Sequence, residues 1–394
     1  MTELKIFQKR QESAFPEKSL FELVELKGQG HPDTLADTIA TQLAIDYSNW
    51  WLENGSCKIE TIPHYNFDKL LIAGGETKKK WGGGTILEPA KVTLAGNSTT
   101  SLGEITIPLD KITEQAVKKV VTKNIHPHFS WEAINRISSS SIALSQNYSN
   151  TTLRSNDTSF GSGHHPNSPL EELVLTIDKR LRELRSEIPW LGSDVKTMGK
   201  RIKDTYHFTL AAAFIDQYIH DETDYLEKKR RLKEEISSLI PERAVLKLNQ
   251  NDKEGAQGIE NYYLTVTGSS SEQDDPGEIG RSNRVTGYIA PLRQQSLEAI
   301  AGKNLVRHIG GFFNFWAKEI AKKIWEEYSI ASQVILLCKI GQPIQKPEVF
   351  VTLLKQENIS LQSIVLEVVE GHLEMVQEIL NGQRRDFYPL KYLP

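Results

Sequence analysis

The sequence predicts an α+β fold built from strand pairs that alternate with helices. Its 394 residues are enough for two to three domains of roughly 150 residues each. Hydrophobic residues make up 39% and charged residues 25% of the chain, as in globular proteins, which excludes a disordered or collagen-like chain. Short strand-like runs occur mostly in pairs between helical stretches, which favours α+β over a doubly wound parallel sheet. These runs group into three strand–strand–helix blocks of similar size.

The first clear elements are a strand, a tight loop and a helix. Residues 1–18 are polar and predict a loose arm or an edge strand, whereas Phe21 to Leu26 predict a strand. A glycine-containing loop, residues 27–33, precedes a helix that begins at Thr34 and ends at Asn54-Gly55. Apolar residues recur every four positions in this helix, at Leu35, Ile39, Leu43 and Tyr47. The loop therefore lies against a helix N-terminus.

The remaining elements follow from the same periodicities. We expect strands at residues 57–62, 69–73, 90–95, 207–215 and 262–267. We expect helices at residues 170–184, 224–240 and 312–328, and a last helix from about Ser360 to Asn381. Residues 134–163 are rich in Ser, Asn and Thr and predict a long loop region, of the kind that tends to be functional.

Charge and cysteine content exclude several classes of protein. The 47 basic and 51 acidic residues leave a net charge of −4, which gives no general attraction for nucleic acid or a membrane surface. No apolar run reaches the roughly 20 residues that span a bilayer, and the first 18 residues lack the apolar core of a secretory signal. Cys57 and Cys338 are too few for a disulfide framework or a cysteine-based zinc site. We therefore expect a soluble, cytoplasmic protein that binds neither nucleic acid nor membrane.

The loop from Gly28 to Asp33 (GQGHPD) has the composition of an anion-binding turn. The N–H groups and dipole of the following helix suit a phosphate, and the glycines, Gly30 among them, let the backbone approach a ligand. His31 can donate to phosphate oxygens, and Asp33 can hold Mg²⁺. The loop is neither a Walker A motif nor a complete Rossmann fingerprint. The alternative interpretation is a capped strand-to-helix turn with a surface histidine.

Three further stretches contain polar residues suited to charged ligands, although each also has an ordinary structural interpretation. Residues 156–163 (NDTSFGSG) could form an Asx turn, and Lys196 in DVKTM could be a solvated surface lysine. The long polar stretch 267–287 precedes AGKN at residues 301–304 and suits a phosphate or a cation. It holds two arginines, Arg281 and Arg284, beside an acidic pair, Asp274 and Asp275. It could equally be a loop of solvated charges.

The order and spacing of these motifs resemble the archaeal-type S-adenosylmethionine synthetases. The resemblance extends from about Leu23 to Pro347, which is most of the chain. The matching motifs, in chain order, are GHPD, HYNFDKLLIAGGE, GGG, NDTSFG, DVKTMG, LAAAFID, TVTGSSSE, GRSNRVTG, AGKN and IGQPI. Each motif is weak by itself, but their common order is specific.

The resemblance implies a fold of three similar α+β units with intertwined chain segments. In this chain an N-terminal arm would cover residues 1–20, and the units would cover 21–130, 131–255 and 256–394, with segments exchanged between them. It also implies a homodimer with active sites at the subunit interface. The implied reaction is attack of the methionine sulfur on the 5′ carbon of ATP, followed by hydrolysis of the released triphosphate to pyrophosphate and phosphate. Mg²⁺ would be required, and K⁺ would activate.

The resemblance further implies which residues serve this reaction. The catalytic donors to phosphate oxygens would be His31, Lys196, Arg281 and Lys303. Gly30 and His308 would complete the ATP-binding set. Asp33 would be a metal ligand, with Asp68 as a second candidate. The methionine and adenosine side would be formed by Glu76, Asp157, Ser159, Phe160 and Asp275.

One departure from the family pattern concerns the sulfur substrate. Ser138 to Ser141 follow Arg136-Ile137, where the archaeal pattern has Gly-Gln-Gly-Ser, a loop that in the family gates the site and contacts methionine. An adenosyltransferase or triphosphatase with an altered sulfur substrate is therefore one alternative. A non-catalytic nucleotide-binding relative is another, and the retained cationic residues argue against it.

Overall fold

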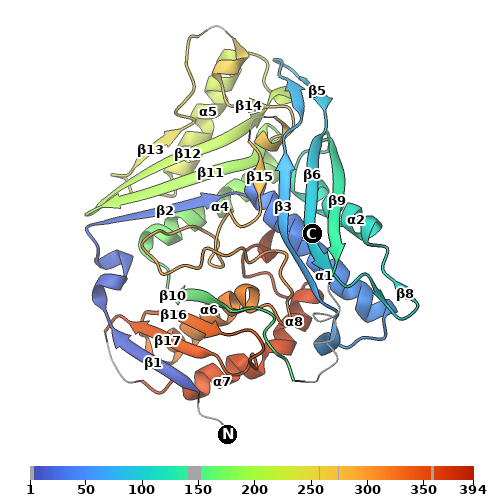
Figure 1. The fold of residues 1–394 in the computed structure, drawn as a ribbon. Coiled ribbons are helices and arrows are strands. Elements are labelled where there is room, and N and C mark those ends of the chain that lie inside the picture. The colour runs from blue at the N-terminus through green and yellow to red at the C-terminus, as the bar shows by residue number, and fades with distance from the viewer. Residues whose placement is uncertain (1–3, 141–151, 257, 274, 356–358) are drawn as a thin grey trace.

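Three main sheets, each with helices against one face, make up the protein. The computed structural model describes residues 4–140, 152–256, 258–273, 275–355 and 359–394. In Figure 1 the sheets lie at the upper left (β2, β11–β13), at the right (β3, β6, β9) and at the bottom (β1, β10, β16, β17). No helix in these described ranges has the length and apolarity that crossing a bilayer requires.

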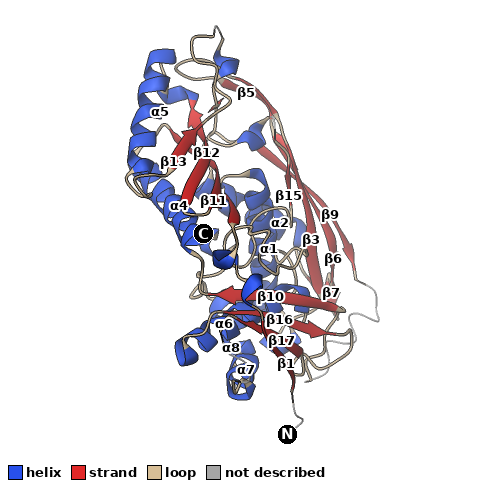
Figure 2. Cartoon of the chain, turned by 90° about the vertical axis from the view of Figure 1, so that its left-hand side faces the viewer, coloured by secondary structure: helices blue, strands red, loops and turns tan. Residues whose placement is uncertain are grey.

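The sheet at the right of Figure 1 has the strand order β15-β3-β6-β9. Its strands are β3 (Tyr65–Ala73), β6 (Ala90–Ser98), β9 (Trp131–Ser139) and β15 (Gly277–Glu278). Helices α1 (Pro32–Asn54) and α2 (Leu109–Asn124) cover one face, and every residue of α1 from 32 to 45 is buried. Figure 2 shows no described helix over the opposite face, where Leu71 is exposed.

The second sheet has the order β13-β12-β11-β2, with β14 beside β12. Its strands are β2 (Phe21–Lys27), β11 (Leu191–Ile202), β12 (Thr205–Ile215), β13 (Val245–Leu248) and β14 (Leu264–Thr265). Helices α4 (Pro169–Glu187) and α5 (Glu222–Ser237) share an apolar core with it. The antiparallel register places Lys196 of β11 opposite Lys27, the last residue of β2. Two basic side chains thus lie beside the loop that leads into α1.

The third sheet collects strands from three distant parts of the chain, in the order β1-β17-β16-β10. These strands are β1 (Lys5–Arg10), β10 (Ser159–His165), β16 (Ser332–Cys338) and β17 (Glu348–Leu353). The helices of this part are α6 (Ile309–Tyr328), α7 (Gln362–Glu370) and α8 (His372–Leu380). A Cβ on Gly161 of β10 would overlap the α6 backbone, so glycine allows the close approach of strand and helix.

Two small hairpins and the C-terminal tail complete the fold. The hairpins are β4 (Glu76–Lys78) with β5 (Thr85–Glu88), and β7 (Ser101–Leu102) with β8 (Ile105–Thr106). The tail, residues 386–394, is anchored in the interior, where Phe387, Tyr388, Leu390, Tyr392 and Leu393 are almost fully buried.

The structure confirms the predicted mixed α+β class and most of its long elements. The four helices expected from the apolar periodicity correspond to α1, α4, α5 and α6. The strands expected at 21–26, 69–73, 90–95 and 207–215 lie within β2, β3, β6 and β12. The N-terminal segment contains the edge strand β1. The division into three similar units with the boundaries given above stays a prediction.

Four expected elements were wrong in part. Residues 57–62 contain a 3₁₀ turn, because Thr61 Oγ1 accepts the Lys58 N–H (2.9 Å) and closes the turn locally. Residues 262–267 contribute only the two-residue β14. The two ends of the expected loop 134–163 are strands, because they belong to β9 and β10. Hydrogen bonding to neighbouring strands outweighs the polar composition there. Residues 141–151 of this expected loop lie outside the described residues. The last helix is divided at Gly371 into α7 and α8.

Candidate functional site

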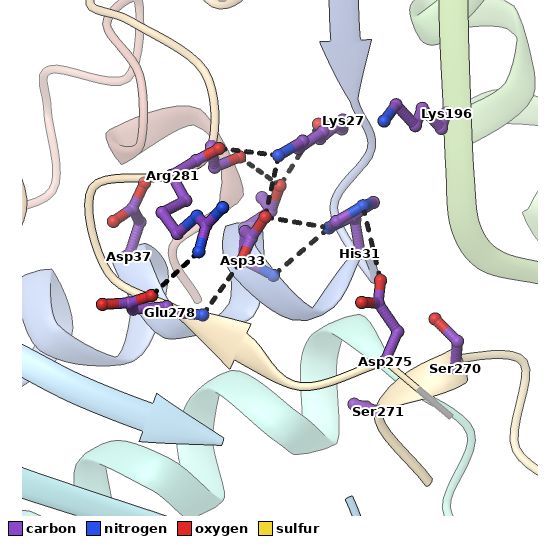
Figure 3. Close-up of polar contacts among 12 residues, drawn as sticks. Lys27, His31, Asp33, Asp37, Lys196, Ser270, Ser271, Asp275, Glu278 and Arg281 are labelled. Carbon is purple, nitrogen blue, oxygen red and sulfur yellow. Dashed lines mark hydrogen bonds and ion pairs between the residues drawn. The ribbon is translucent and has the colours of Figure 1, made fainter. Parts of the chain in front are cut away.

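The loop between β2 and α1 gathers the first group of candidate residues, which we call the His31 cluster (Figure 3). It consists of Lys27, His31, Asp33, Lys196, Asp275, Glu278 and Arg281. The strand–loop–helix order expected from the sequence places it at the N-terminus of α1. The backbone of Gly30 is used by the fold itself, since its N–H donates to Ser193 O (3.0 Å) and its carbonyl accepts from Ser269 Oγ (2.7 Å).

His31 caps α1 and is held as a neutral imidazole. Its Nδ1 accepts the Asp33 N–H (3.2 Å), so the ring proton lies on Nε2, which is 3.9 Å from Asp275 Oδ2. Burial lowers the pKa of His31 to about 3, and the Asp33 carboxylate opposes that shift. The imidazole therefore presents one N–H donor, without a charge, toward the open side of the cluster.

Asp33 joins the helix to the loop that carries Arg281. Its Oδ2 accepts from Lys27 Nζ (2.8 Å), and its Oδ1 accepts the Glu278 N–H (2.9 Å). Lys27 Nζ also donates to the Arg281 carbonyl (2.7 Å). Each Asp33 oxygen retains a lone pair, which suits a cation that binds mostly to waters and phosphates, such as Mg²⁺. No group of three or more His, Cys, Asp or Glu suited to a metal occurs among the residues described.

Lys196 and Arg281 extend from the cluster toward solvent. Lys196 Nζ lies 3.4 Å from Glu25 Oε1, and Arg281 Nη1 lies 3.2 Å from Glu278 Oε2. The Arg281 side chain is 71% exposed, so this ion pair is weak and its guanidinium can reorient toward an anion. Both cations are thus available to a ligand that approaches the N-terminus of α1.

A second group of candidates, the Lys303 cluster, lies at the N-terminus of α6. It consists of Asp68, Asp157, Ser159, Glu298, Lys303 and His308. Lys303 Nζ lies 2.6 Å from Glu298 Oε2 and 4.0 Å from Asp68 Oδ2, with only 4% of its side chain exposed. The Glu298 carboxylate, the Ser159 hydroxyl and the Lys303 ammonium all lie around Gly310, where an added Cβ would overlap the carboxylate and come within 3.0 Å of the hydroxyl and 3.1 Å of the ammonium.

Several buried polar atoms of this second cluster, and one of the residue after Lys303, have no hydrogen-bond partner among the described residues. They are Ser159 Oγ, Asn304 Nδ2 and His308 Nδ1. His308 is the N-cap residue of α6 but makes no capping bond, and its Nε2 lies 3.8 Å from Asp157 Oδ2. Burial, aided by the nearby Lys303, lowers the pKa of His308 to about 3. Unpaired buried polar atoms are costly unless a ligand or water completes them, so these three atoms are candidates to contact a bound ligand.

Both clusters lie along α1 and β3, but within one chain no hydrogen bond or ion pair between described residues joins them. Gly302, the residue before Lys303, lies against Ala40 of α1. Ala40 is seven residues after Asp33 on the same helix, which corresponds to roughly 10 Å along the helix axis. On β3, Ile72 pairs with Gly277 beside the first cluster, and Asp68 approaches Lys303 in the second. The structure therefore gathers His31, Lys196 and Arg281 in one place and Lys303 in another.

The other candidates lie near these clusters to different degrees. Glu76 is exposed in the β4–β5 hairpin, where neighbouring Thr77 donates to Gln273 (2.8 Å), close to the segment that leads to Asp275. Phe160 is exposed on β10 beside Ser159. Of the serine run, Ser138 and Ser139 end β9, whereas Ser141 lies outside the described residues.

Sequence reasoning missed two residues of the clusters and one residue beside the His31 cluster (Figure 3). Lys27 immediately precedes the recognised loop, and its position at the end of a strand facing Lys196 could have identified it. Glu298 lies five residues before Lys303, and an acid so close to AGKN was a usable signal. Asp37, one turn beyond Asp33 on α1, gives no local signal because its partners lie at residues 280 and 388.

Known proteins resemble this chain over most of its length. Residues 4–383 match the sequence model of the family described as "S-adenosylmethionine synthetase (AdoMet synthetase)". An S-adenosylmethionine synthase of Thermoplasma volcanium is 39% identical over 85% of this chain and 85% of its own. Those of Sulfolobus acidocaldarius (38%; 91% of each chain) and Methanothrix thermoacetophila (35%; 94% of this chain and 96% of its own) are similarly close.

Proposed function

Because the chain belongs to the S-adenosylmethionine synthetase family, we propose that its His31 and Lys303 clusters together bind the triphosphate of ATP. The protein is a methionine adenosyltransferase, which transfers the adenosyl group of ATP to the sulfur of methionine. The observation that carries the proposal is that each cluster places N–H or cationic donors at the N-terminus of a long, buried helix. Such helix ends attract anions.

In this reaction the enzyme must mainly stabilise the departing triphosphate. The methionine sulfur is neutral, and its lone pair forms the bond to the 5′ carbon, so no general base is required. The bond between that carbon and its oxygen breaks, and the electron pair leaves with the triphosphate. Donors that are already in place stabilise this growing negative charge. We assign that role to His31 Nε2–H, Lys196, Arg281 and Lys303, and place Gly30 and His308 beside the phosphates.

The donor set around Asp33 fits the Mg²⁺ ion that the family generally uses. Mg²⁺ commonly binds one or two carboxylates together with waters and substrate phosphates, so a cage of several acids is not needed. When bound, the ion neutralises part of the phosphate charge. We assign Asp33 as its ligand, with Asp68 as a second candidate, and expect K⁺ to activate.

The methionine and adenosine moieties would occupy the side of the site that carries acidic and aromatic groups. An amino-acid substrate carries an ammonium group, which a half-exposed carboxylate such as Asp157 or Asp275 can accept. Ser159 offers a hydroxyl that no other described residue hydrogen-bonds, and Phe160 offers an exposed ring. Glu76 completes this set.

We further propose a cytoplasmic homodimer in which the His31 cluster of one protomer faces the Lys303 cluster of its partner. The face of the β15-β3-β6-β9 sheet that no described helix covers supports this arrangement, because such a face is a natural contact surface. A site formed across two protomers would join clusters that are separate within one chain. It would also make the isolated protomer inactive.

A product assay tests the function directly. With ATP, methionine and Mg²⁺, we expect S-adenosylmethionine, pyrophosphate and phosphate in equal amounts by mass spectrometry and phosphate analysis. The absence of any adenosylated methionine at saturating substrates would contradict this. Release of phosphate from tripolyphosphate without methionine transfer would instead favour a different sulfur substrate, as the serine run that ends β9 suggests.

A further inference from the structure

We propose that Tyr388, in the C-terminal tail, is a positioning residue that sets the place of Arg281 through Asp37 and Gly280. The inference rests on the proposed role of Arg281 as a donor to the triphosphate. It extends that function by assigning to the tail a part in forming the phosphate site.

The contact chain begins at the tail and ends beside Arg281. The Tyr388 hydroxyl donates to Asp37 Oδ2 (2.6 Å), and Asp37 Oδ1 accepts the Gly280 N–H (2.7 Å). The Gly280 carbonyl accepts from Arg284 Nη1 (2.9 Å). Both backbone groups of the residue immediately before Arg281 are therefore fixed, one of them by a carboxylate that Tyr388 holds.

The contact chain that starts at Tyr388 fixes the backbone turn at Gly280. Its φ of +80° lies in the left-handed region, and a Cβ there would come within 2.9 Å of the Ala299 side chain. The turn thus depends on hydrogen bonds rather than on side-chain packing at this residue. Because Arg281 follows directly and its side chain is mostly exposed, the direction of the turn decides where the guanidinium points.

Tyr388 also ties the tail to the far end of the same loop. Its N–H donates to the Val285 carbonyl (3.3 Å), so Tyr388 is linked to the loop on both sides of Arg281, directly at Val285 and through Asp37 at Gly280. Asp37 is fully buried, and burial raises its pKa to about 7, while its bonds to Tyr388 and Gly280 oppose the shift. Loss of the tyrosine hydroxyl would leave a buried carboxylate oxygen without its donor.

The tail itself offers a matched control. Tyr392 is as buried as Tyr388, and its hydroxyl lies 3.4 Å from Asp178 Oδ2 on α4, away from Arg281. Tyr388→Phe and Tyr392→Phe each remove one hydroxyl from a buried aromatic side chain of the same segment. A general weakening of the tail would affect both variants alike.

The test measures kcat, the KM for ATP and the melting temperature of the full-length protein. We expect Tyr388→Phe to lower kcat roughly tenfold, as loss of a hydrogen bond to a charged group allows, and Tyr392→Phe to leave kcat within about twofold. Both variants should have similar melting temperatures. Equal kcat values in the two variants would overturn the inference.

A double-mutant cycle separates positioning from general stabilisation. If Tyr388 acts through Arg281, Tyr388→Phe should cause no further loss in an Arg281→Lys background. If the loss of kcat in the double variant equals the product of the losses in the two single variants, the inference is overturned, while the proposed function stays intact. A normal rate for Arg281→Lys and Arg281→Ala would instead refute the proposed phosphate site itself.

Discussion

The His31 and Lys303 clusters occupy equivalent positions on their helices, but they differ in how many of their polar side-chain atoms are hydrogen-bonded. Each lies at the N-terminus of a long buried helix, and each helix has histidine as its N-cap residue. His31 makes the capping bond, and each Asp33 oxygen accepts one hydrogen bond, from Lys27 or from a backbone N–H. His308 makes no capping bond, and its Nδ1 is unpartnered among the described residues.

Under the proposal that the two clusters form one site, this difference gives them separate roles. The His31 cluster is a preorganised set of donors whose geometry exists before a ligand arrives. The Lys303 cluster contains a buried cation held by Glu298 and polar atoms that a ligand would complete. We therefore expect changes in the first cluster to affect mainly turnover, and changes in the second to affect both binding and turnover.

The largest expected effect comes from removing one cation of each cluster. Arg281→Ala and Lys303→Ala should each lower kcat/KM by roughly 10²–10³-fold, because each removes a charge-assisted bond to the departing triphosphate. Lys303→Ala should also raise the KM for ATP, since its buried ammonium binds the ground state as well. Initial rates with varied ATP measure both quantities, and near-normal rates in both variants would show that the site is elsewhere.

Asp33→Asn should have the next largest effect. The amide keeps the size of the side chain but loses the charge that holds Lys27 and would bind Mg²⁺. We expect a fall in kcat of roughly tenfold or more and a higher Mg²⁺ concentration at half-maximal rate. A circular-dichroism melt close to that of the wild type would exclude unfolding as the cause. An unchanged Mg²⁺ titration would refute the assignment of Asp33.

Glu298→Gln should act in the opposite direction on binding. Glu298 pairs with the buried Lys303 ammonium and, under the proposal, would compete with ATP for it, so its neutralisation should lower the KM for ATP about three- to tenfold. Glu278→Gln is the matched change in the His31 cluster, where the pair with Arg281 is exposed, and it should alter KM little. Equal effects in the two variants would remove the distinction between the clusters.

The last prediction concerns acid stability near the Lys303 cluster rather than activity, so no change in kcat or KM is needed to see it. His372 is buried, its Nε2 contacts the Val306 carbonyl (3.0 Å), and burial lowers its pKa from 6.5 to about 4. Between those values the unfolded chain binds a proton that the folded protein does not, so the free energy of unfolding falls as pH falls. His372→Phe should reduce that loss by up to about 3 kcal/mol. Urea unfolding of the wild type and the variant at pH 7 and pH 4.5 measures how far the free energy of unfolding falls between the two pH values. An equal fall in both proteins would contradict the prediction.

Local periodicity predicted the helices that carry the clusters, but not the contacts that assemble the clusters. The apolar spacing in α1 and α6 and the loop composition at 28–33 were sufficient to place His31 and Asp33 at a helix N-terminus. Strand register was not readable, so Lys27 opposite Lys196 was missed. Partners far apart in the chain, such as Asp37 with Tyr388, leave no local pattern. Polar composition misled at β9, because pairing with β6 overrides weak strand propensity.

The most direct test of the central claim is complementation between two inactive variants. Arg281→Ala and Lys303→Ala protomers would be co-expressed with different affinity tags, and the mixed dimer would be isolated and assayed. If each site joins clusters from two protomers, one site of the mixed dimer keeps both cations, and about half of the wild-type activity per dimer should return. Activity no higher than that of either parent variant would contradict a shared site.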